Sequence, residues 1–212
     1  GLASIQKKLA TLQRINSAAD DAAGLAISEG FRSQVRQFNV ESASIQSGVN
    51  LAQTAEAGLT AQGDAISRIR ELAVQASNGA NSPEQRQALN NEAQQLVQAI
   101  GDAAQNTEFN GVRPLDGSAG SVTLDAAGTI GVQLQQSTVA SLGLNGLDLS
   151  TQAGASAAIS QLDQAAKAVT QNRSSLGAQQ NTLEGAASAR DLAAQNAQEA
   201  DSRIRDLDVA RA

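Results

Sequence analysis

The side chains of this sequence that could do chemistry are almost entirely carboxylates. The 212 residues include no His and no Cys, which excludes a Ser-His-Asp triad, a Cys nucleophile and an ordinary zinc site. Paired carboxylates could still act as general acid and base. The 21 Asp and Glu residues are instead scattered among the polar positions of helical patterns, as on a solvated helix face. The sequence therefore predicts a protein that is not an enzyme and that uses no cofactor or metal.

Charge and hydropathy exclude two further kinds of partner. The net charge of -6 and the pI of about 4.6 argue against nucleic acid, because phosphate binding needs a dense basic surface. No run of 18 apolar residues occurs, so we expect no segment of the chain to span a membrane. The lack of Cys excludes disulfides and is compatible with an extracellular protein that is stabilised by assembly.

The elements that must carry the polar side chains are long helices. Between about residues 20 and 78 there is no Pro, and apolar residues recur at a spacing of seven. Ser17 or Asp20 would cap this helix, which would be roughly 90 Å long. The heptad indicates a seam that faces partner helices. Its members are Phe31, Phe38, Ile45, Ala52, Leu59, Ile66 and Ala73.

A second, shorter helix is predicted over residues 82–105. Asn78-Gly79 would end the first helix with glycine as its C-terminal cap. Ser82 and Gln85 then form a capping box around Pro83, which is favourable at a first helical position. The short connection predicts that this helix folds back antiparallel on the first.

The remaining chain contains a period-two segment and a second long helix. Alternating apolar residues over about 120–135 predict a β-hairpin. A heptad without Pro predicts a helix over about 155–208. The predicted fold is mainly α: an elongated, rod-like bundle of two long helices and one shorter helix, with a small β-hairpin at one end. The expected bundle seam consists of Phe31, Phe38, Ile45, Leu59, Ile66, Leu96, Ile100, Leu162, Val169, Leu176 and Leu183.

Five glycines lie inside the first predicted helix, although each costs about 1 kcal/mol relative to Ala in a helix interior. One interpretation is that tertiary packing tolerates them. The other is that some of them permit close approach of a neighbouring helix or subunit. They are Gly24, Gly30, Gly48, Gly58 and Gly63.

Several segments together resemble the bacterial flagellin family, in the right order and spacing. The segment RINSAADDAAGLAIS is similar to the N-terminal signature of that family, and NTEFNGVRPLDG is similar to its Q-T-x-F-N-G-x-x-L turn. The other matching segments are SGVNLAQTAEAGL, SRIRELAVQASNG, SSLGAQQNTLE and SRIRDLDVA.

The resemblance implies a structural subunit of the bacterial flagellar filament, used for motility. Such a subunit would be secreted through the flagellar export apparatus, assemble with its own copies outside the cell, and meet an export chaperone as the full-length protein. Residues 1–18 would be a remnant of the N-terminal helix and spacer of the terminal domain. Residues 19–212 would form the core rod domain of a short flagellin without outer domains.

A protein-binding surface is also implied. The segment SRIRELAVQ resembles the flagellin surface that Toll-like receptor 5 of animals recognises, and the matching positions are Arg68, Leu72 and Glu92. An exposed Arg-Leu pair at i and i+4 with a carboxylate nearby also suits protein binding or axial contact between subunits. The alternative is that Arg68 and Glu92 are solvated surface residues and that Leu72 packs in the core.

Two other classes of protein share features with this sequence. A flagellin-like hook–filament junction protein shares the terminal helices but usually diverges at RINSAADDAAG and RIRELAVQ. The signalling hairpin of chemoreceptors is also rich in Ala and Gln, but it needs a helical tip. The β-period and glycines of residues 117–150 argue against such a tip.

Overall fold

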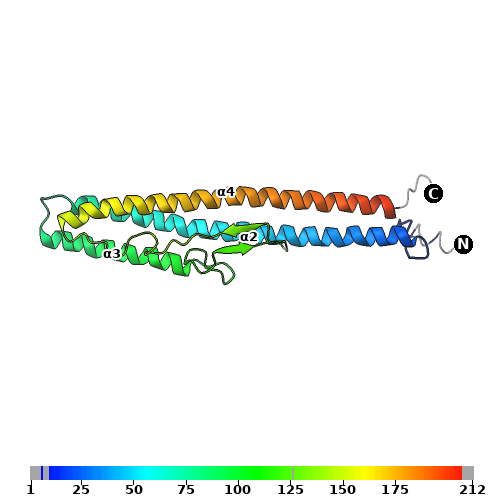
Figure 1. Cartoon of the computed structure of the whole chain (residues 1–212), viewed down its shortest axis with the longest axis horizontal. Helices are drawn as coiled ribbons and strands as arrows, with labels where there is room; N and C mark the ends of the chain where they lie inside the picture. Colours follow the sequence, from blue (N-terminus) through cyan, green and yellow to red (C-terminus); the bar gives the residue numbers. More distant parts are fainter. Residues whose placement is uncertain (1–5, 7–9, 126, 207–212) are drawn as a thin grey trace. The chain divides into compact units, whose positions relative to one another are not determined.

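A computed structural model describes residue 6, residues 10–125 and residues 127–206 of the chain. In this part the fold is mainly α, with helices α2 (Ala22–Ala76), α3 (Pro83–Asn106) and α4 (Gln152–Arg205). The strands β1 (Ser121–Thr123) and β2 (Gly131–Gln133) form one antiparallel pair (Figure 1). The predicted helices and hairpin are confirmed to within a few residues. Of residues 1–18, in which the resemblance implies a remnant of an N-terminal helix, residues 6, 10 and 11 are helical, and residues 1–5 and 7–9 lie outside the described part.

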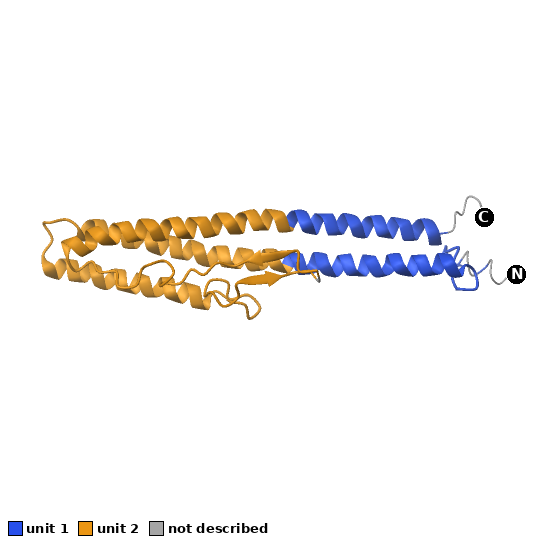
Figure 2. Ribbon diagram, in the orientation of Figure 1, with its two compact units in different colours: residues 1–46, 184–212 blue, residues 47–183 orange. Residues whose placement is uncertain are grey.

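The chain divides into two compact units, which are described separately (Figure 2). Unit 1 contains residues 1–46 and 184–212, and unit 2 contains residues 47–183. Helices α2 and α4 both run through the two units, so each unit contains one part of each helix.

In unit 2, three helices and an extended segment enclose a continuous apolar core. The seam residues Leu59, Ile66, Ile100 and Leu162 are fully buried. Exposed ion pairs join α2 to α4, from Arg70 to Asp163 at 2.8 Å and from Glu56 to Arg173 at 3.5 Å. The core of unit 2 also includes Ala52, Ala73, Ala93, Val97, Leu115, Val132, Val169, Leu176 and Leu183.

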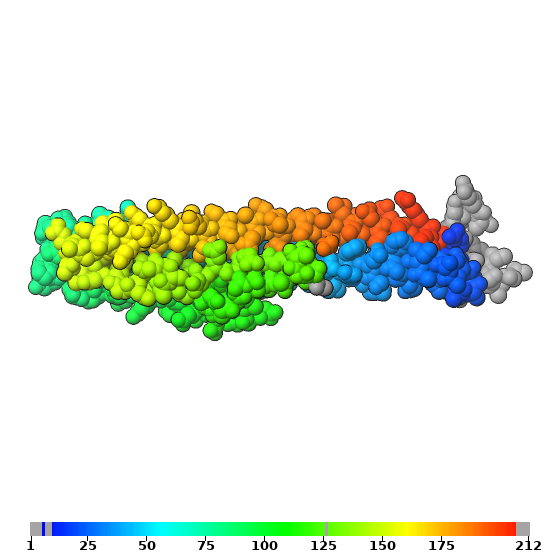
Figure 3. Space-filling view, in the orientation of Figure 1, coloured from blue at the N-terminus to red at the C-terminus, as the bar shows by residue number. Residues whose placement is uncertain are grey.

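The segment between β2 and α4 is part of this core although it has no regular structure. Its five leucines, Leu134, Leu142, Leu144, Leu147 and Leu149, are buried. Two side chains of α3 hold its backbone: Gln94 donates to the carbonyl of Leu147 at 2.6 Å, and Asn90 accepts from the Leu149 amide at 2.9 Å. In the space-filling view this yellow-green segment forms a continuous surface with α4 (Figure 3).

The β-hairpin pairs Val122 with Val132 and lies in unit 2. The Leu124 side chain contacts the α2 backbone at Gly48, and the Gln133 amide donates to Gln179 of α4 at 2.6 Å. Both contact points lie near the middle of their helices. These contact points also lie close to residues 47 and 183, where unit 2 ends, so the hairpin lies at one end of the three-helix unit.

The helix termini follow the predicted chemistry in part. At α3 the Ser82–Gln85 capping box is present, with Pro83 as the first residue. At α2, Asp21 accepts from the Gly24 amide at 2.9 Å, so Asp21 rather than Ser17 or Asp20 caps the helix. Gly79 has no left-handed backbone. The end of α2 is instead closed by a side-chain amide, since Asn81 donates to the Gln75 carbonyl at 2.6 Å.

In unit 1, the first part of α2 lies antiparallel to the last part of α4. Arg32 binds Asp201 at 3.2 Å, and the buried Ser28 hydroxyl also donates to Asp201. Further along the pair, Glu41 binds Arg190 at 2.7 Å. Arg190 occupies the position where the heptad of α4 is broken, so a cross-helix ion pair replaces an apolar contact there.

Three predicted seam residues are only half-buried. Ile45 is fully buried, but Phe31 and Phe38 remain partly exposed, because among the described residues this stretch of α2 packs against α4 alone. In unit 2, Leu96 is also half-buried, since the neighbouring Val97 takes the core position of α3. The heptad correctly predicted which residues of each helix face the other helices. It overestimated how completely their side chains are buried.

The helix glycines divide between the two interpretations. A Cβ at Gly58 would lie 2.6 Å from Thr107 Oγ1 and 2.7 Å from Leu115 Cδ1, so this glycine permits close approach of the loop after α3. Gly48 permits close approach of Leu124 in the same way. Gly30 has open space around it. The close approaches at Gly48 and Gly58 thus come from the segment of the same chain that follows α3.

Candidate protein-binding site

The predicted surface site is built around Arg68 of α2. Its guanidinium donates to Glu92 Oε1 of α3 through Nη2 at 2.9 Å and through Nε at 3.2 Å. Nη1 donates to Glu71 Oε2 at 2.8 Å. The fork of one arginine therefore joins two helices and binds two carboxylates. Arg68 and Glu92 are about half exposed, and Glu71 is 67% exposed. We call Arg68, Glu71 and Glu92 the arginine cluster.

Electrostatics keep the arginine cluster ionic. The hydrogen bonds to Glu71 and then to Glu92, together with their negative charge, raise the pKa of Arg68 above its ordinary value. The two carboxylates outnumber the single guanidinium. The cluster therefore presents a fixed pattern of donors and acceptors with a surplus negative charge.

Leu72 does not belong to the exposed surface. Its side chain is only 1% exposed, beside the fully buried Ile69 and Ala73. The expectation of an exposed Arg68–Leu72 pair is wrong, because the helix face that carries Leu72 is covered within unit 2. The alternative interpretation, in which Leu72 packs in the core, is the one that the structure supports. Arg68 and Glu92 are brought together as the sequence suggested.

A buried polar contact holds the helices that carry the cluster. The Gln62 side chain of α2 donates to the carbonyls of Ile100 in α3, at 3.1 Å, and of Ser137, at 2.8 Å. The Ser137 hydroxyl donates back to Gln62 Oε1 at 2.6 Å. Both side chains are fully buried and paired. Such a satisfied network favours one arrangement of α2 against α3.

Two contacts near the cluster were missed by sequence reasoning. Glu71 lies three residues after Arg68, a spacing at which ion pairs form along a helix, so a local signal for it was present. The pair between Arg70 and Asp163 joins residues far apart in the sequence and left no local signal.

The arginine cluster is an open, charged patch on the surface. In the described ranges there is no group of three or more Asp or Glu residues that could hold a metal ion. Nor does any helix among these residues have the length and apolarity to cross a membrane. The half-exposed, mutually paired charges of the cluster lack the enclosed pocket that acid–base catalysis needs.

Comparison with known proteins identifies the family. Residues 1–120 match the bacterial flagellin N-terminal helical region, and residues 159–212 match the bacterial flagellin C-terminal helical region. A flagellin of Halalkalibacterium halodurans is 41% identical, over 97% of this chain and 78% of its own length.

Solved structures agree with this assignment. The crystal structure of Bacillus cereus flagellin matches with a TM-score of 0.62 at 29% identity, over 68% of this chain and 86% of that one. A putative flagellar hook-associated protein from Vibrio parahaemolyticus matches with a TM-score of 0.72, over 88% of this chain and 100% of that one. Its 13% identity shows a shared fold alone. The matching family models and the β-hairpin contradict the chemoreceptor alternative. The chain therefore belongs to the bacterial flagellin family and is a structural, non-enzymatic subunit of the extracellular flagellar filament.

Proposed function

We propose that the arginine cluster is the surface through which this subunit contacts another protein along the filament axis. The observation that carries the proposal is the bidentate contact of Arg68 with Glu92 at 2.9 and 3.2 Å, which joins α2 to α3 on an exposed face. Because the side chains already hold one another, little side-chain freedom remains to be lost on binding.

The same surface is proposed as a recognition site for Toll-like receptor 5 of an animal host. Arg68, Leu72 and Glu92 match the positions implied by the family resemblance, and two of them are exposed and paired. Arginine is common among the residues that dominate binding energy in protein interfaces. Leu72 would act indirectly, by supporting the turn of α2 that carries Arg68.

Surface variants with a matched control test both contacts. Arg68→Ala and Glu92→Ala should each weaken binding to the receptor ectodomain by about tenfold, equivalent to about 1.4 kcal/mol. Arg70→Ala is the control, because Arg70 is an equally exposed arginine of α2 whose partner, Asp163, lies on α4. Surface plasmon resonance measures receptor affinity, and sedimentation of polymers measures axial contact. Equal affinities for Arg68→Ala, Arg70→Ala and the unaltered chain would rule out the cluster as the receptor site.

An export chaperone is a further proposed partner of the full-length protein. The proposal is supported by membership of the flagellin family and by no particular residue of the described chain. A chaperone purified from the same bacterium should bind the unassembled subunit in a pull-down assay and should be displaced on assembly. Equal binding to subunits and to polymers would contradict it.

We also propose the division into residues 1–18, as part of a terminal domain, and residues 19–212, as the core rod domain. The start of α2 at Ala22 supports a boundary near residue 19. Limited proteolysis should cleave before Ala22 sooner than within α2. First cleavage near residue 47, where the two compact units meet in the sequence, would contradict this boundary.

A further inference from the structure

We propose that Asn145 is a site of spontaneous deamidation, at which water replaces the side-chain amide nitrogen and leaves aspartate or isoaspartate. The site lies in unit 2, in the segment between β2 and α4, within a turn from Leu144 to Leu147. This chemistry is separate from filament assembly and from receptor binding.

An asparagine that is followed by glycine meets the least hindrance in this reaction, because glycine has no side chain. The backbone nitrogen of the glycine attacks the side-chain carbonyl carbon of the asparagine and forms a C–N bond. Ammonia leaves with the proton of that backbone nitrogen, and a five-membered succinimide remains. Water then opens the ring at one of its two carbonyl groups. One opening gives aspartate, and the other gives isoaspartate, in which the backbone runs through the former side chain.

Three Asn-Gly pairs occur in the sequence, and each begins with an exposed asparagine: Asn78, Asn110 and Asn145. Because glycine follows in all three, the local sequence gives them the same reactive nitrogen. The peptide group between the two residues must rotate before that nitrogen reaches the side-chain carbon. The fold therefore decides which pair reacts first, through the bonds and backbone angles that hold this peptide group.

The peptide group between Asn145 and Gly146 is the least restrained of the three. The φ angle is 74° at Gly146 and is not positive at Asn145, which is the pattern of a type II turn. One long backbone bond closes the turn, from the Leu147 amide to the Leu144 carbonyl at 3.4 Å. Within the described residues, neither the Asn145 side chain nor this peptide group makes a hydrogen bond. A Cβ at Gly146 would meet no atom within 4 Å, so space for rotation is present.

The type II turn also allows this rotation without disturbing its neighbours. Type I and type II turns differ by a flip of the central peptide group, and asparagine and glycine suit the two central positions of both. The flip can carry the Gly146 nitrogen to the side-chain carbon of Asn145. Leu144 and Leu147 stay in the core meanwhile, where they are 1% and 2% exposed.

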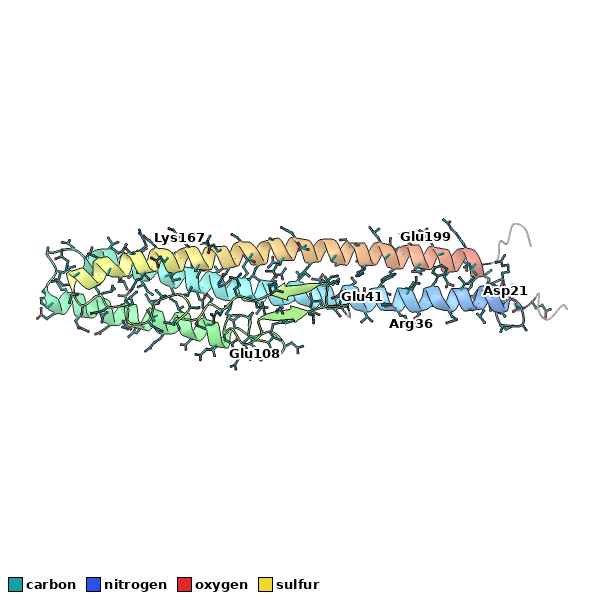
Figure 4. All side chains as sticks on the ribbon, viewed as in Figure 1. Asp21, Arg36, Glu41, Glu108, Lys167 and Glu199 are labelled. Carbon is teal, nitrogen blue, oxygen red and sulfur yellow. The ribbon has the colours of Figure 1, made fainter. Side chains whose placement is uncertain are left out.

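Asn110 lies in a turn that resists the same flip. Phe109 and Val112 exchange two backbone hydrogen bonds of 2.9 Å, and φ is 50° at Asn110 and 82° at Gly111. These are the signs of a type I′ turn, and a flip would give type II′, which takes glycine at the position of Asn110. An asparagine there would be strained. This turn follows α3 and lies close to Glu108, which Figure 4 labels.

Asn78 is held through both of its carbonyl groups. Its side-chain oxygen accepts from the Ala80 amide at 3.0 Å. Its backbone oxygen accepts from the Asn81 amide at 3.2 Å and from Arg86 Nη1 at 3.3 Å. Rotation of the peptide group that follows Asn78 breaks the two backbone contacts, so this pair should react more slowly than Asn145.

The two products at position 145 should affect unit 2 differently. Aspartate adds a negative charge at an exposed position and leaves the backbone unchanged. Isoaspartate adds one carbon to the backbone between the buried Leu144 and Leu147. The Leu147 carbonyl also accepts a hydrogen bond from Gln94 of α3 at 2.6 Å. Isoaspartate should therefore loosen the segment from α3, because both leucines can no longer keep their places.

Peptide mapping of the full chain during incubation tests the site. Folded protein is kept at mildly alkaline pH, and mass spectrometry of digests gives the deamidated fraction at each Asn-Gly pair with time. Asn145 should convert several-fold faster than Asn78 and Asn110. The same incubation in urea removes the fold and should bring the three rates close together. Equal rates in the folded protein, or an excess at Asn145 that persists unchanged in urea, would overturn the proposal.

Urea unfolding of aged protein tests the consequence for packing. Protein enriched in isoaspartate at position 145 should unfold at a lower urea concentration than fresh protein. Fresh Asn145→Asp carries the added charge without the longer backbone and should match the fresh unaltered chain. Asn145→Gln, aged in the same way, controls for damage elsewhere, since glutamine would need a less favourable six-membered ring. An aged sample as stable as fresh Asn145→Asp would contradict the effect of isoaspartate on the segment.

Discussion

Unit 1 and unit 2 use the same two helices but bury them to different degrees. In unit 2 the heptad residues Leu59 and Ile66 are fully covered by α3, α4 and the extended segment. In unit 1, Phe31 and Phe38 belong to the same heptad and stay half-exposed. Exposed large apolar side chains follow this division. In the described ranges Leu12, Ile27, Val40 and Leu192 lie in unit 1, whereas Val74 lies in unit 2.

This difference shows that a heptad specifies which residues face a partner and not how many partners there are. A two-helix seam leaves part of each large side chain in water, whereas a third layer removes it. Unit 2 therefore has the character of a folded core. Unit 1 has the character of a surface that another molecule can complete.

The largest expected effect comes from emptying the core of unit 2. Leu59→Ala should lower the free energy of unfolding by about 3 kcal/mol, because it leaves a closed cavity among fully buried neighbours. Phe38→Ala in unit 1 should cost only about 1.5 kcal/mol, although it removes more atoms, because water can enter the space. Urea denaturation followed by circular dichroism measures both. A larger loss for Phe38→Ala would reverse the comparison.

Breaking the ion pair of the unit 1 seam should come next in size. Arg190→Leu leaves Glu41, whose side chain is 14% exposed, without its partner at 2.7 Å. The expected loss is about 2 kcal/mol, as for other partly buried charges left unpaired. Arg173→Leu in unit 2 is the matched control, because its partner Glu56 is 39% exposed and should tolerate the change. Thermal melting of both variants decides the comparison, and equal melting temperatures would contradict it.

Two glycine substitutions, one in each unit, should have opposite signs. Gly58→Ala in unit 2 should destabilise by about 1 kcal/mol or more, because its Cβ would meet Leu115 and Thr107 at less than 3 Å. Gly30→Ala in unit 1 should stabilise the free chain by about 0.5–1 kcal/mol, because nothing surrounds that position. Chemical denaturation gives both signs directly. The account would be wrong for Gly58 if its alanine variant were the more stable one.

The smallest expected effect is a pH dependence confined to the hairpin loop of unit 2. The hydrogen bond from the Thr129 hydroxyl and the bond from the Ile130 amide lower the pKa of Asp125. Because the pKa of Asp125 is lower in the folded protein, its carboxylate contributes fully to stability above its unfolded pKa of about 3.9. This stabilisation is lost as the pH falls through the folded pKa. NMR signals of Thr129 and Ile130 should therefore change below about pH 4. Asp125→Asn should remove that titration, and an identical titration in both proteins would contradict its assignment.

Sequence reasoning predicted what local patterns determine. The heptads indicated α2 and α4, Ser82 and Gln85 indicated the start of α3, and the period of two indicated the hairpin. It failed where distant segments decide. Leu72 was expected at the surface. The period of a helix shows one apolar face, and it does not show which other faces are covered by further elements of the fold. Gly79 was expected as a cap, but Asn81 satisfies the Gln75 carbonyl in its place.

The candidate site was predicted in part for the same reason. Arg68 and Glu92 were named from family resemblance, and the structure joins them across two helices. Neither the second carboxylate, Glu71, nor the buried Gln62–Ser137 contact was found. The latter depends on a turn that brings residues 75 positions apart in the sequence together, which no local pattern records.

Hydrogen exchange measured by mass spectrometry, on free subunits and on assembled filaments, tests most directly whether neighbours complete unit 1. In the free chain, amides of α2 in unit 1 should exchange faster than those of α2 in unit 2, because fewer buried contacts hold that part of the helix. Assembly should slow exchange in residues 22–46 and change residues 48–76 much less. Equal protection of both parts in the free chain, or no added protection of residues 22–46 in the filament, would contradict the account.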